Sequence, residues 1–264
     1  MKHRKLIIAL LVLILFACDK FEYSHYQILH NEDYRNINQK NISQFIDTIN
    51  DTVTIAVIGD SQRFYDATGK IITKINNIPN INFVVHTGDL VDFGLQKEYI
   101  WMHEQLSSIN YPYVAVVGNH DLIGNGGEIY NLMYGDYNFS FTFNGNKFIY
   151  INTNSREYNF NSNVPDIQWL DNELSDTSNY NNAIIVCHVS HLNVDFNSEL
   201  KDEYISVLRK YKKVLLSING HNHNFSFTVP GSDNISYLNT YSTSKEKFVL
   251  VKIWDTNFSH EIID

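Results

Sequence analysis

Val53-Thr54-Ile55-Ala56-Val57-Ile58-Gly59-Asp60 contains the clearest strand of the sequence. Its first six residues are apolar or β-branched, and the run stops abruptly at glycine and aspartate. Such a run is typical of a strand that is buried on both faces, as in parallel sheets. Asp60 would then follow the carboxyl end of the strand, where open α/β sheets form their ligand-binding crevices. The stretch therefore predicts an α/β fold with a polar side chain at the ligand-binding edge of its sheet.

The rest of the chain alternates strand-like and helix-like segments. Helical patterns at 69–78 and 95–108 separate the first strand from strands predicted at 82–86 and 113–117, which indicates parallel βαβ units. After Gly127 the pattern becomes hairpin-like, with strands at 138–143 and 147–152 around Asn144-Gly145-Asn146. The remaining segments are helices at 166–174 and 198–211, and strands at 183–187, 214–218, 225–229, 235–238, 248–253 and 259–263.

Five of the predicted strands end in residues of the kinds that bind metals. Taken singly, each has an ordinary explanation, since aspartate after glycine is a common turn and a lone histidine is more often a surface or core residue. Together they supply carboxylates, an amide and three imidazoles, which is a nitrogen and oxygen ligand set for two cations. On an extended stretch, residues two apart point the same way, so His221 and His223 are expected to reach neighbouring metals. The strand ends read Gly59-Asp60-Ser61-Gln62, Gly88-Asp89-Leu90-Val91-Asp92, Gly118-Asn119-His120-Asp121, Cys187-His188 and Gly220-His221-Asn222-His223.

The order of these motifs resembles the calcineurin-like metallophosphoesterase family. The resemblance runs from Val53 to about Ile263. It implies a four-layer αββα sandwich of two mixed β-sheets flanked by helices, and an enzyme that uses two divalent metal ions. It also implies the ligands, which are Asp60, Gln62, Asp89 and His223 for one ion, and Asp89, Asn119, His188 and His221 for the other, so that Asp89 bridges the two.

The resemblance further implies hydrolysis of a phosphate ester by a hydroxide that bridges the two ions, because paired cations lower the pKa of a shared water. His120 is then expected to donate a proton to the leaving group or to stabilise its charge, with Asp121 holding the imidazole ring. Asp92 is expected to support the metal ligands without binding metal itself, or only to cap the next helix. Arg63 is either a contact for the substrate phosphate or a solvent-facing arginine.

Two positions depart from the usual family pattern. Gln62 stands where most members have histidine, and an amide oxygen is a harder and weaker donor than imidazole. Manganese is therefore the first expectation for the two metals, with magnesium, iron or zinc as alternatives, and water is the alternative to Gln62 as a ligand. His188 is followed by Val189-Ser190-His191, without the proline that many members carry. His188 is the expected ligand and His191 a nearby alternative.

The first residues resemble a bacterial lipoprotein signal. The chain begins with the basic segment Met1-Lys2-His3-Arg4-Lys5, residues 6–17 form an apolar run, and Leu15-Phe16-Ala17-Cys18 resembles a lipobox. The sequence thus predicts a signal peptide at 1–17, export, and lipidation of Cys18, which would anchor the protein on the periplasmic or cell-surface side of a membrane. An ordinary signal peptide with a chance cysteine is the alternative.

The expected domain organisation follows from these patterns. Residues 18–51 are polar and are expected to form a tether with a short helix near 42–49. Residues 52–264 are expected to form one calcineurin-like metallophosphoesterase domain. The second cysteine, Cys187, lies in an apolar run and is expected to be a small buried hydrophobic residue.

The charge of the chain limits its partners. The net charge is -9 and the isoelectric point about 5.6, so a dedicated nucleic-acid-binding surface is not expected. The expected substrate is a small-molecule phosphate ester, attracted by the local field of the cations. The alternative function is a surface lipoprotein that keeps the fold as a binding or structural module with weak or silent metal sites. The motifs predict neither the type of phosphate ester, monoester or diester, nor the oligomeric state of the protein.

Overall fold

The computed structural model describes residues 24, 27–28, 31–45, 52–230 and 235–264. The predicted signal peptide at 1–17, Cys18 and much of the predicted tether lie outside the described residues. None of the described helices combines the length and the apolar composition that crossing a bilayer requires.

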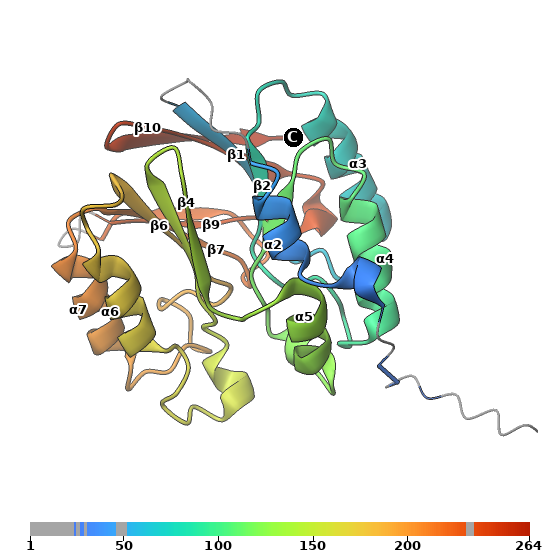
Figure 1. The fold of residues 1–264 in the computed structure, drawn as a ribbon, viewed down its shortest axis with the longest axis horizontal. Helices are drawn as coiled ribbons and strands as arrows, with labels where there is room; N and C mark the ends of the chain where they lie inside the picture. Colours follow the sequence, from blue (N-terminus) through green and yellow to red (C-terminus); the bar gives the residue numbers. More distant parts are fainter. Residues whose placement is uncertain (1–23, 25–26, 29–30, 46–51, 231–234) are drawn as a thin grey trace, which may run out of the picture.

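Two mixed β-sheets form the centre of the molecule (Figure 1). Within each sheet the central neighbours are parallel, from β1 to β3 in the first sheet and from β5 through β6 and β7 to β9 in the second. Each sheet therefore has one edge where the carboxyl ends of its parallel strands collect. The first sheet has the order β11 (Asn257–Ile263), β10 (Phe248–Trp254), β1 (Thr52–Ile58), β2 (Phe83–His86) and β3 (Tyr113–Ala115). The second has the order β4 (Phe139–Phe143), β5 (Asn146–Tyr150), β6 (Asn182–Val186), β7 (Val214–Asn219), β9 (Ser236–Asn239) and β8 (Ser226–Thr228).

Helices cover the outer faces of both sheets (Figure 1). The first sheet packs against α3 (Tyr65–Asn76), α4 (Gln96–Leu106) and α5 (Gly126–Tyr134), and the second against α6 (Ile167–Ser175) and α7 (Lys201–Lys210). The predicted four-layer αββα sandwich is thus confirmed. Short 3-10 helices lie in the connections, at η1 (Glu32–Tyr34), η2 (His120–Leu122), η3 (Ser155–Tyr158) and η4 (Thr243–Lys245).

The residues of β1 alternate between two hydrophobic cores. Val53, Ile55 and Val57 pack between the two sheets, whereas Ala56 and Ile58 pack under the helices. All five side chains are buried. This double burial explains the unbroken apolar run in the sequence, since a strand between two layers has no face left for water.

Helix α5 was not predicted from the sequence. It begins at Gly126 and Gly127, and glycine is a poor helix former. Its Ile129, Tyr130 and Met133 are buried against the first sheet, and this tertiary packing overrides the weak local preference. The other predicted elements that lie wholly within the described residues are present, and the largest boundary difference among them is at α3, which begins at Tyr65 and was predicted to begin at Gly69.

Helix α2 (Ile37–Ile42) ends where the predicted helix at 42–49 was to begin, and residues 46–49 lie outside the described part. The side-chain amide of Asn38 both donates to the carbonyl of Ala115 and accepts from its N–H, each at 2.9 Å, and Asn41 donates to the carbonyl of Tyr113 at 2.8 Å. These two asparagines pair with the open edge of β3 as a further strand would. Part of the segment predicted as a tether is therefore packed into the fold.

Candidate metal centre

Seven predicted ligand residues come together where the strands of both sheets end. Asp60 and Gln62 follow β1, Asp89 follows β2, and Asn119 follows β3, so the first sheet supplies every carboxylate and amide. His188 follows β6, and His221 and His223 follow β7, so the second sheet supplies every imidazole. The site thus lies at the common edge of the two sheets.

Four donor atoms form a compact group around one point. Oδ1 of Asn119 lies 3.0 Å from Nε2 of His188 and 2.9 Å from Nδ1 of His221, and the two ring nitrogens are 3.3 Å apart. Oδ2 of Asp89 lies 3.3 Å from Nε2 of His188. Two ligand atoms that are each about 2.1 Å from one cation and at right angles are about 3.0 Å apart. The spacing of these atoms fits a divalent cation among them.

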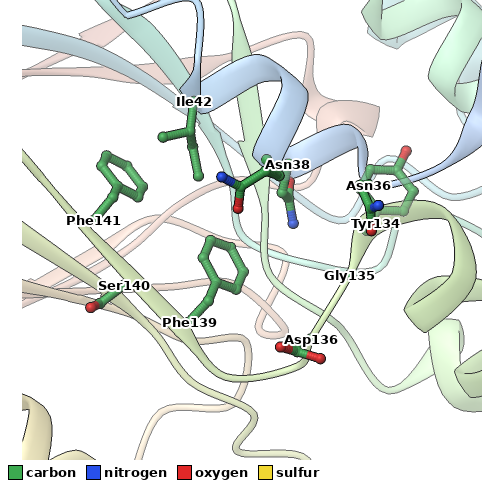
Figure 2. Close-up of a pocket in the computed structure, with 10 residues that line it drawn as sticks. Asn36, Asn38, Ile42, Tyr134, Gly135, Asp136, Phe139, Ser140 and Phe141 are labelled. Atoms are coloured by element: carbon green, nitrogen blue, oxygen red, sulfur yellow. The ribbon is translucent and has the colours of Figure 1, made fainter.

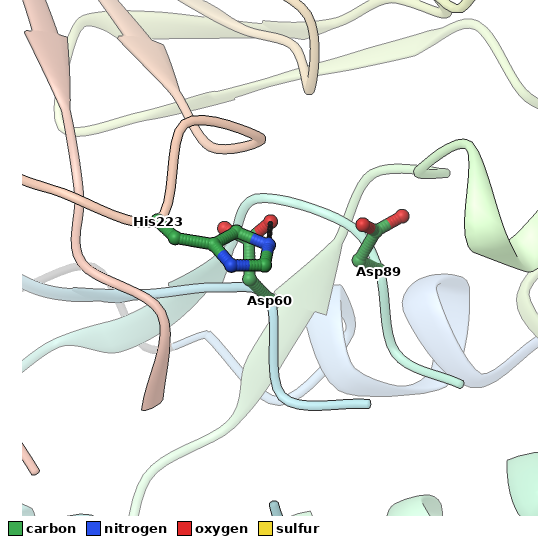
Figure 3. A group of neighbouring side chains, drawn as sticks. All are labelled: Asp60, Asp89 and His223. Atoms are coloured by element: carbon green, nitrogen blue, oxygen red, sulfur yellow. Dashed lines mark ion pairs between the residues drawn. The ribbon is translucent and has the colours of Figure 1, made fainter. Parts of the chain in front are cut away.

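A second group of donors also includes Asp89. Asp60, Asp89 and His223 each offer a ligand atom, and these atoms lie within 4.8 Å of one another (Figure 3). Nε2 of His223 lies 3.3 Å from Oδ1 of Asp60. Gln62 is buried, and its Oε1 has no hydrogen-bond partner within the part of the chain that the structure describes. A buried amide oxygen without a partner is costly in a folded protein, and a cation at this position would satisfy it.

The ionisable groups of the cluster favour positive charge between them. Burial opposes a charge on His188, but the carboxylate of Asp89 outweighs it and raises the pKa of His188 to about 10. Burial opposes a charge on Asp89 as well, yet His188 lowers the pKa of this carboxyl group. A hydrogen bond to Asp60 raises the pKa of His223. The buried carboxylates are therefore stabilised by positive charge, which either protons or metal ions can supply.

His120 lies beside the cluster, and its backbone N–H donates to Oδ1 of Asp89 at 2.9 Å. Nδ1 of its ring lies 2.9 Å from the backbone carbonyl of Asp92. A carbonyl can only accept, so Nδ1 is the donor in this contact, and the lone pair of the neutral ring is on Nε2. Among the described residues, Nε2 of His120 has no hydrogen-bond partner, so it is free to meet a substrate atom.

The contact predicted between Asp121 and His120 is wrong. Both carboxylate oxygens of Asp121 are occupied by backbone N–H groups, of Gly118 at 2.7 Å and Val91 at 3.1 Å. Asp121 therefore ties the third strand end to the second, and burial together with the charge of Asp89 raises its pKa to about 8. The ring of His120 is held by Asp92 instead.

Asp92 and Arg63 form an ion pair beside His120. Oδ1 of Asp92 lies 3.3 Å from a guanidinium nitrogen of Arg63 and 3.6 Å from Nδ1 of His120. The side chain of Arg63 is 61% exposed, whereas that of Asp92 is 9% exposed. Arg63 thus faces solvent, with its position fixed by a buried carboxylate. Asp92 does not cap α4, because the N-cap of that helix is Leu95.

His191, the alternative ligand, lies apart from the donor atoms. Its buried ring packs against Tyr237, with ring centroids 4.6 Å apart, and against Phe196 and Tyr204. His188 is the residue that the structure brings to the cluster. Cys187 is buried as predicted, and it accepts a hydrogen bond from Nδ2 of Asn219 at 2.8 Å.

The backbone at the strand ends is bent sharply. Asp60, Asp89, His221 and His223 have φ values of 49°, 57°, 70° and 58°, in the left-handed region that residues with side chains seldom adopt. Such strain collects at functional sites, where the surrounding structure maintains it. The stretch from His221 to His223 is therefore not extended as predicted, and it is this turned backbone that sends His221 to Asn119 and His223 to Asp60.

Gly118 shows why glycine precedes these ligands. A Cβ atom at this position would overlap the backbone nitrogen and the carboxylate of Asp89. The third strand end can approach the second this closely only without a side chain. Gly88 serves differently, since its φ is 92°.

The sequence model of the calcineurin-like phosphoesterase family matches residues 53–225. The chain belongs to this family. A curated relative, the 3′,5′-cyclic-nucleotide phosphodiesterase of Nostoc sp. (strain PCC 7120), is 30% identical over 155 residues, which cover 55% of this chain. The match spans 57% of that relative, so the chain covers little more than half of its length.

Solved structures of other proteins share the fold of this calcineurin-like phosphoesterase. A dimetal phosphatase from Danio rerio superposes with a TM-score of 0.65 at 13% identity, covering 80% of this chain and 95% of the other. The anchor in the inner membrane complex of Plasmodium superposes with a TM-score of 0.61 at 17% identity, covering 81% and 84%. One fold thus occurs in a protein described as a phosphatase and in one described as an anchor, so the fold alone does not decide activity.

Sequence reasoning on this calcineurin-like phosphoesterase missed three residues around the cluster. His86, wholly buried at the end of β2, accepts from the N–H of Gly88 at 3.2 Å and lies 2.9 Å from the hydroxyl of Ser61. Burial lowers its pKa to about 3, so a neutral ring supports the turn before Asp89. Asp195 and Arg156 approach the cluster from two loops, and their positions depend on folding that no local pattern announces.

A cavity of about 370 Å³ lies between α2, the end of α5 and β4 (Figure 2). Asn38, Tyr134 and Phe139 are among its lining residues, and none of the predicted metal ligands is. The cavity and the metal centre are therefore formed by different residues.

Proposed function

We propose that the protein is a phosphoesterase that uses two divalent metal ions, and that phosphodiesters are its substrates. The observation that carries this proposal is that Asp89 belongs to two groups of donor atoms, one with Asp60 and His223 and one with Asn119 and His188. A pair of divalent cations held there would supply an activated water as nucleophile and would neutralise charge on the phosphate.

The residues of the chain would divide the remaining work. The buried carboxylates and imidazoles hold the cations at fixed positions, and the hydrogen bonds of Asp121 keep two strand ends in register. His120 presents Nε2 for proton transfer to the leaving oxygen, because Asp92 occupies Nδ1. Arg63 is exposed beside it and offers a fixed positive charge to a phosphate oxygen.

Two observations support a diester substrate. The curated relative from Nostoc is named for cyclic nucleotides, which are phosphodiesters. A cavity of about 240 Å³ borders the loop that carries His221 and His223, and its lining includes Asn193 and Asn222. Amide side chains both donate and accept hydrogen bonds, so this cavity suits the polar organic part of a diester.

Manganese is the metal we propose first for both sites. The second group of donors, with Asp60, Asp89, Gln62 and His223, contains two carboxylates and an amide oxygen beside a single imidazole, and hard oxygen ligands favour manganese or magnesium over zinc. Zinc, iron and magnesium are the alternatives that a metal analysis separates.

The test is an assay of purified protein with each metal on a chromogenic diester, bis(p-nitrophenyl) phosphate, and the matching monoester, followed by 3′,5′-cyclic nucleotides. We expect turnover with Mn²⁺, loss of turnover after chelation, and faster turnover of the diester. A protein that binds the metals but turns over none of these esters would point instead to a binding or structural module.

We further propose that the protein is exported and anchored by a lipid on Cys18, on the periplasmic or cell-surface side of a membrane. Support comes from the apolar run at 6–17 and from Leu15-Phe16-Ala17-Cys18. Metabolic labelling with a fatty acid in a bacterial host should mark the wild-type protein and not Cys18→Ser. Equal labelling of both proteins would contradict the proposed lipid anchor on Cys18.

A further inference from the structure

The carboxylate of Asp195 joins the metal centre to a neighbouring loop. Asp195 lies in the connection between β6 and α7. It does not belong to any of the five strand ends at which the sequence predicts metal ligands. Its Oδ2 lies 3.0 Å from Nε2 of His221 and 3.1 Å from a guanidinium nitrogen of Arg156. One carboxylate oxygen thus faces an imidazole on one side and a guanidinium on the other.

The two ring nitrogens of His221 have different surroundings. Nδ1 lies within the donor group, 2.9 Å from Oδ1 of Asn119 and 3.3 Å from Nε2 of His188. A nitrogen that binds a metal presents a lone pair, so the proton of a neutral ring must sit on the other nitrogen. That nitrogen, Nε2, faces Asp195. The carboxylate is therefore placed to accept its proton in a hydrogen bond.

We propose that Asp195 is a positioning residue for the cation held by Asn119, His188 and His221. By accepting from Nε2, it fixes the ring of His221 in the orientation and tautomer that turn Nδ1 toward the metal. The inference rests on the metal centre proposed above, and it adds a residue from a separate loop to that centre.

Asp195 is itself held at several points. Arg156, in η3, pairs with the same oxygen, and the backbone N–H of Asp195 donates to the side chain of Asn193 at 2.8 Å. The amide of Asn193 donates in turn to Oδ1 of Asn222 at 2.7 Å, and Asn222 lies between the two histidines of the next loop. The two loops are thus tied together both through His221 and through Asn222, so the carboxylate arrives at a set position.

Burial separates the role of Asp195 from that of Arg156. The side chains of Asp195 and His221 are 19% and 17% exposed, whereas that of Arg156 is 62% exposed. An exposed ion pair contributes little by itself, whereas a partner of a metal-bound histidine typically changes metal affinity 10- to 100-fold. We therefore expect the larger effect from Asp195 and a smaller one from Arg156, and we expect both in metal binding rather than in folding.

The experiment titrates metal-free protein with Mn²⁺ by calorimetry. The variants are Asp195→Ala, Asp195→Asn and Arg156→Ala. The matched control is Asp171→Ala, which removes a carboxylate paired with Lys210 at 2.8 Å on the surface formed by α6 and α7. Thermal unfolding of each metal-free variant is recorded beside the titration.

We expect wild-type protein and Asp171→Ala to bind two ions with the same dissociation constants. In Asp195→Ala, one ion should bind about 10- to 100-fold more weakly and the other unchanged. Asp195→Asn should fall between, because an amide oxygen still accepts from Nε2 but carries no charge. On the diester, kcat should fall more than KM rises, because Asp195 acts through His221.

Three results distinguish the possible failures. Unchanged affinity for both ions in Asp195→Ala and Asp195→Asn would overturn the inference while leaving the metal centre intact. Equal weakening of both ions together with a lower unfolding temperature would also overturn it, since that is the mark of a general structural role. Absence of metal binding in the wild-type protein would instead overturn the proposed function.

Discussion

Nε2 of His188 lies 3.3 Å from Oδ2 of Asp89, and these two atoms join the two sheets of the sandwich. Asp89 leaves the first sheet after β2, and His188 leaves the second sheet after β6. Both side chains are almost fully buried. The contact means that neither sheet can form this site alone, so the chemistry of the protein depends on how the two sheets are packed together.

Replacing Asp89 with alanine should remove both metal ions and abolish turnover. Asp89 is the residue that both groups of donor atoms share, and its loss takes a ligand from each. Metal content after dialysis, measured by mass spectrometry, checks the prediction. Asp66→Ala, an exposed aspartate at the start of α3, should keep two ions and full activity. An Asp89→Ala protein that keeps one tightly bound ion would show that Asp89 is not shared.

Replacing His120 with alanine should leave both ions in place and slow turnover about 10²- to 10⁴-fold. The imidazole of His120 is proposed to transfer a proton to the leaving group, and it does not belong to either group of metal-binding donor atoms. The measurements are kcat on the diester and metal content of the same preparation. Asp92→Asn should slow turnover less, because the backbone carbonyl of Asp92 still holds Nδ1. Loss of metal from His120→Ala would contradict this division of roles.

Gln62→Leu should weaken the binding of one ion by about tenfold or more without destabilising the metal-free protein. Leucine has a similar size but no donor atom, and the Oε1 that it removes is buried without a hydrogen-bond partner in the described ranges. Removal of such an atom relieves a cost of about 1–3 kcal/mol in the metal-free state. Calorimetry with Mn²⁺ and chemical unfolding of the metal-free protein measure the two effects. If Mn²⁺ affinity is unchanged, water rather than Gln62 fills that position.

Metal binding should release about one proton per protein at pH 7.5. The pKa of His188 in the folded, metal-free protein is raised to about 10, so its ring carries a proton that the cation must displace. Mn²⁺ affinity should therefore rise with pH, by up to about tenfold per unit between the ordinary histidine value and 10. Titrations in buffers of different ionisation enthalpy count the protons. Mn²⁺ affinity that is independent of pH in this range would contradict it.

The same shift makes the stability of the metal-free protein depend on pH. Because the folded pKa of His188 is above its ordinary value of 6.5, its contribution to the free energy of unfolding is fully present below pH 6.5. That contribution is lost as the pH rises through about 10. His188→Gln should remove this dependence, which chemical unfolding at a series of pH values would reveal.

The strands and the polar residues at their ends could be predicted from the sequence because both rest on local patterns. A strand such as β1, buried between two layers, needs an unbroken apolar run, and the turn after it needs glycine. Asp60 and Asp89 directly follow such a run and glycine, so a short stretch of sequence is enough to predict their positions. Helix α5 was missed because its glycines give no helical signal and its stability comes from packing.

The rest of the site depends on contacts between distant segments. Asp92 and Asp121 are both carboxylates near His120, and only the folded backbone shows that Asp121 is occupied by Gly118 and Val91. Asp195 comes from a loop with no motif of its own, and its place is set by Arg156 and His221. Such roles follow from tertiary geometry, which spacing along the chain does not encode.

The most direct test of the central claim is anomalous diffraction from crystals grown with Mn²⁺, recorded at the manganese absorption edge. The account predicts two anomalous peaks about 3.5–4 Å apart with the carboxylate of Asp89 between them. One peak should lie against Asp60 and His223, and the other against Asn119 and His188. A single peak, or two peaks that do not share Asp89, would contradict it.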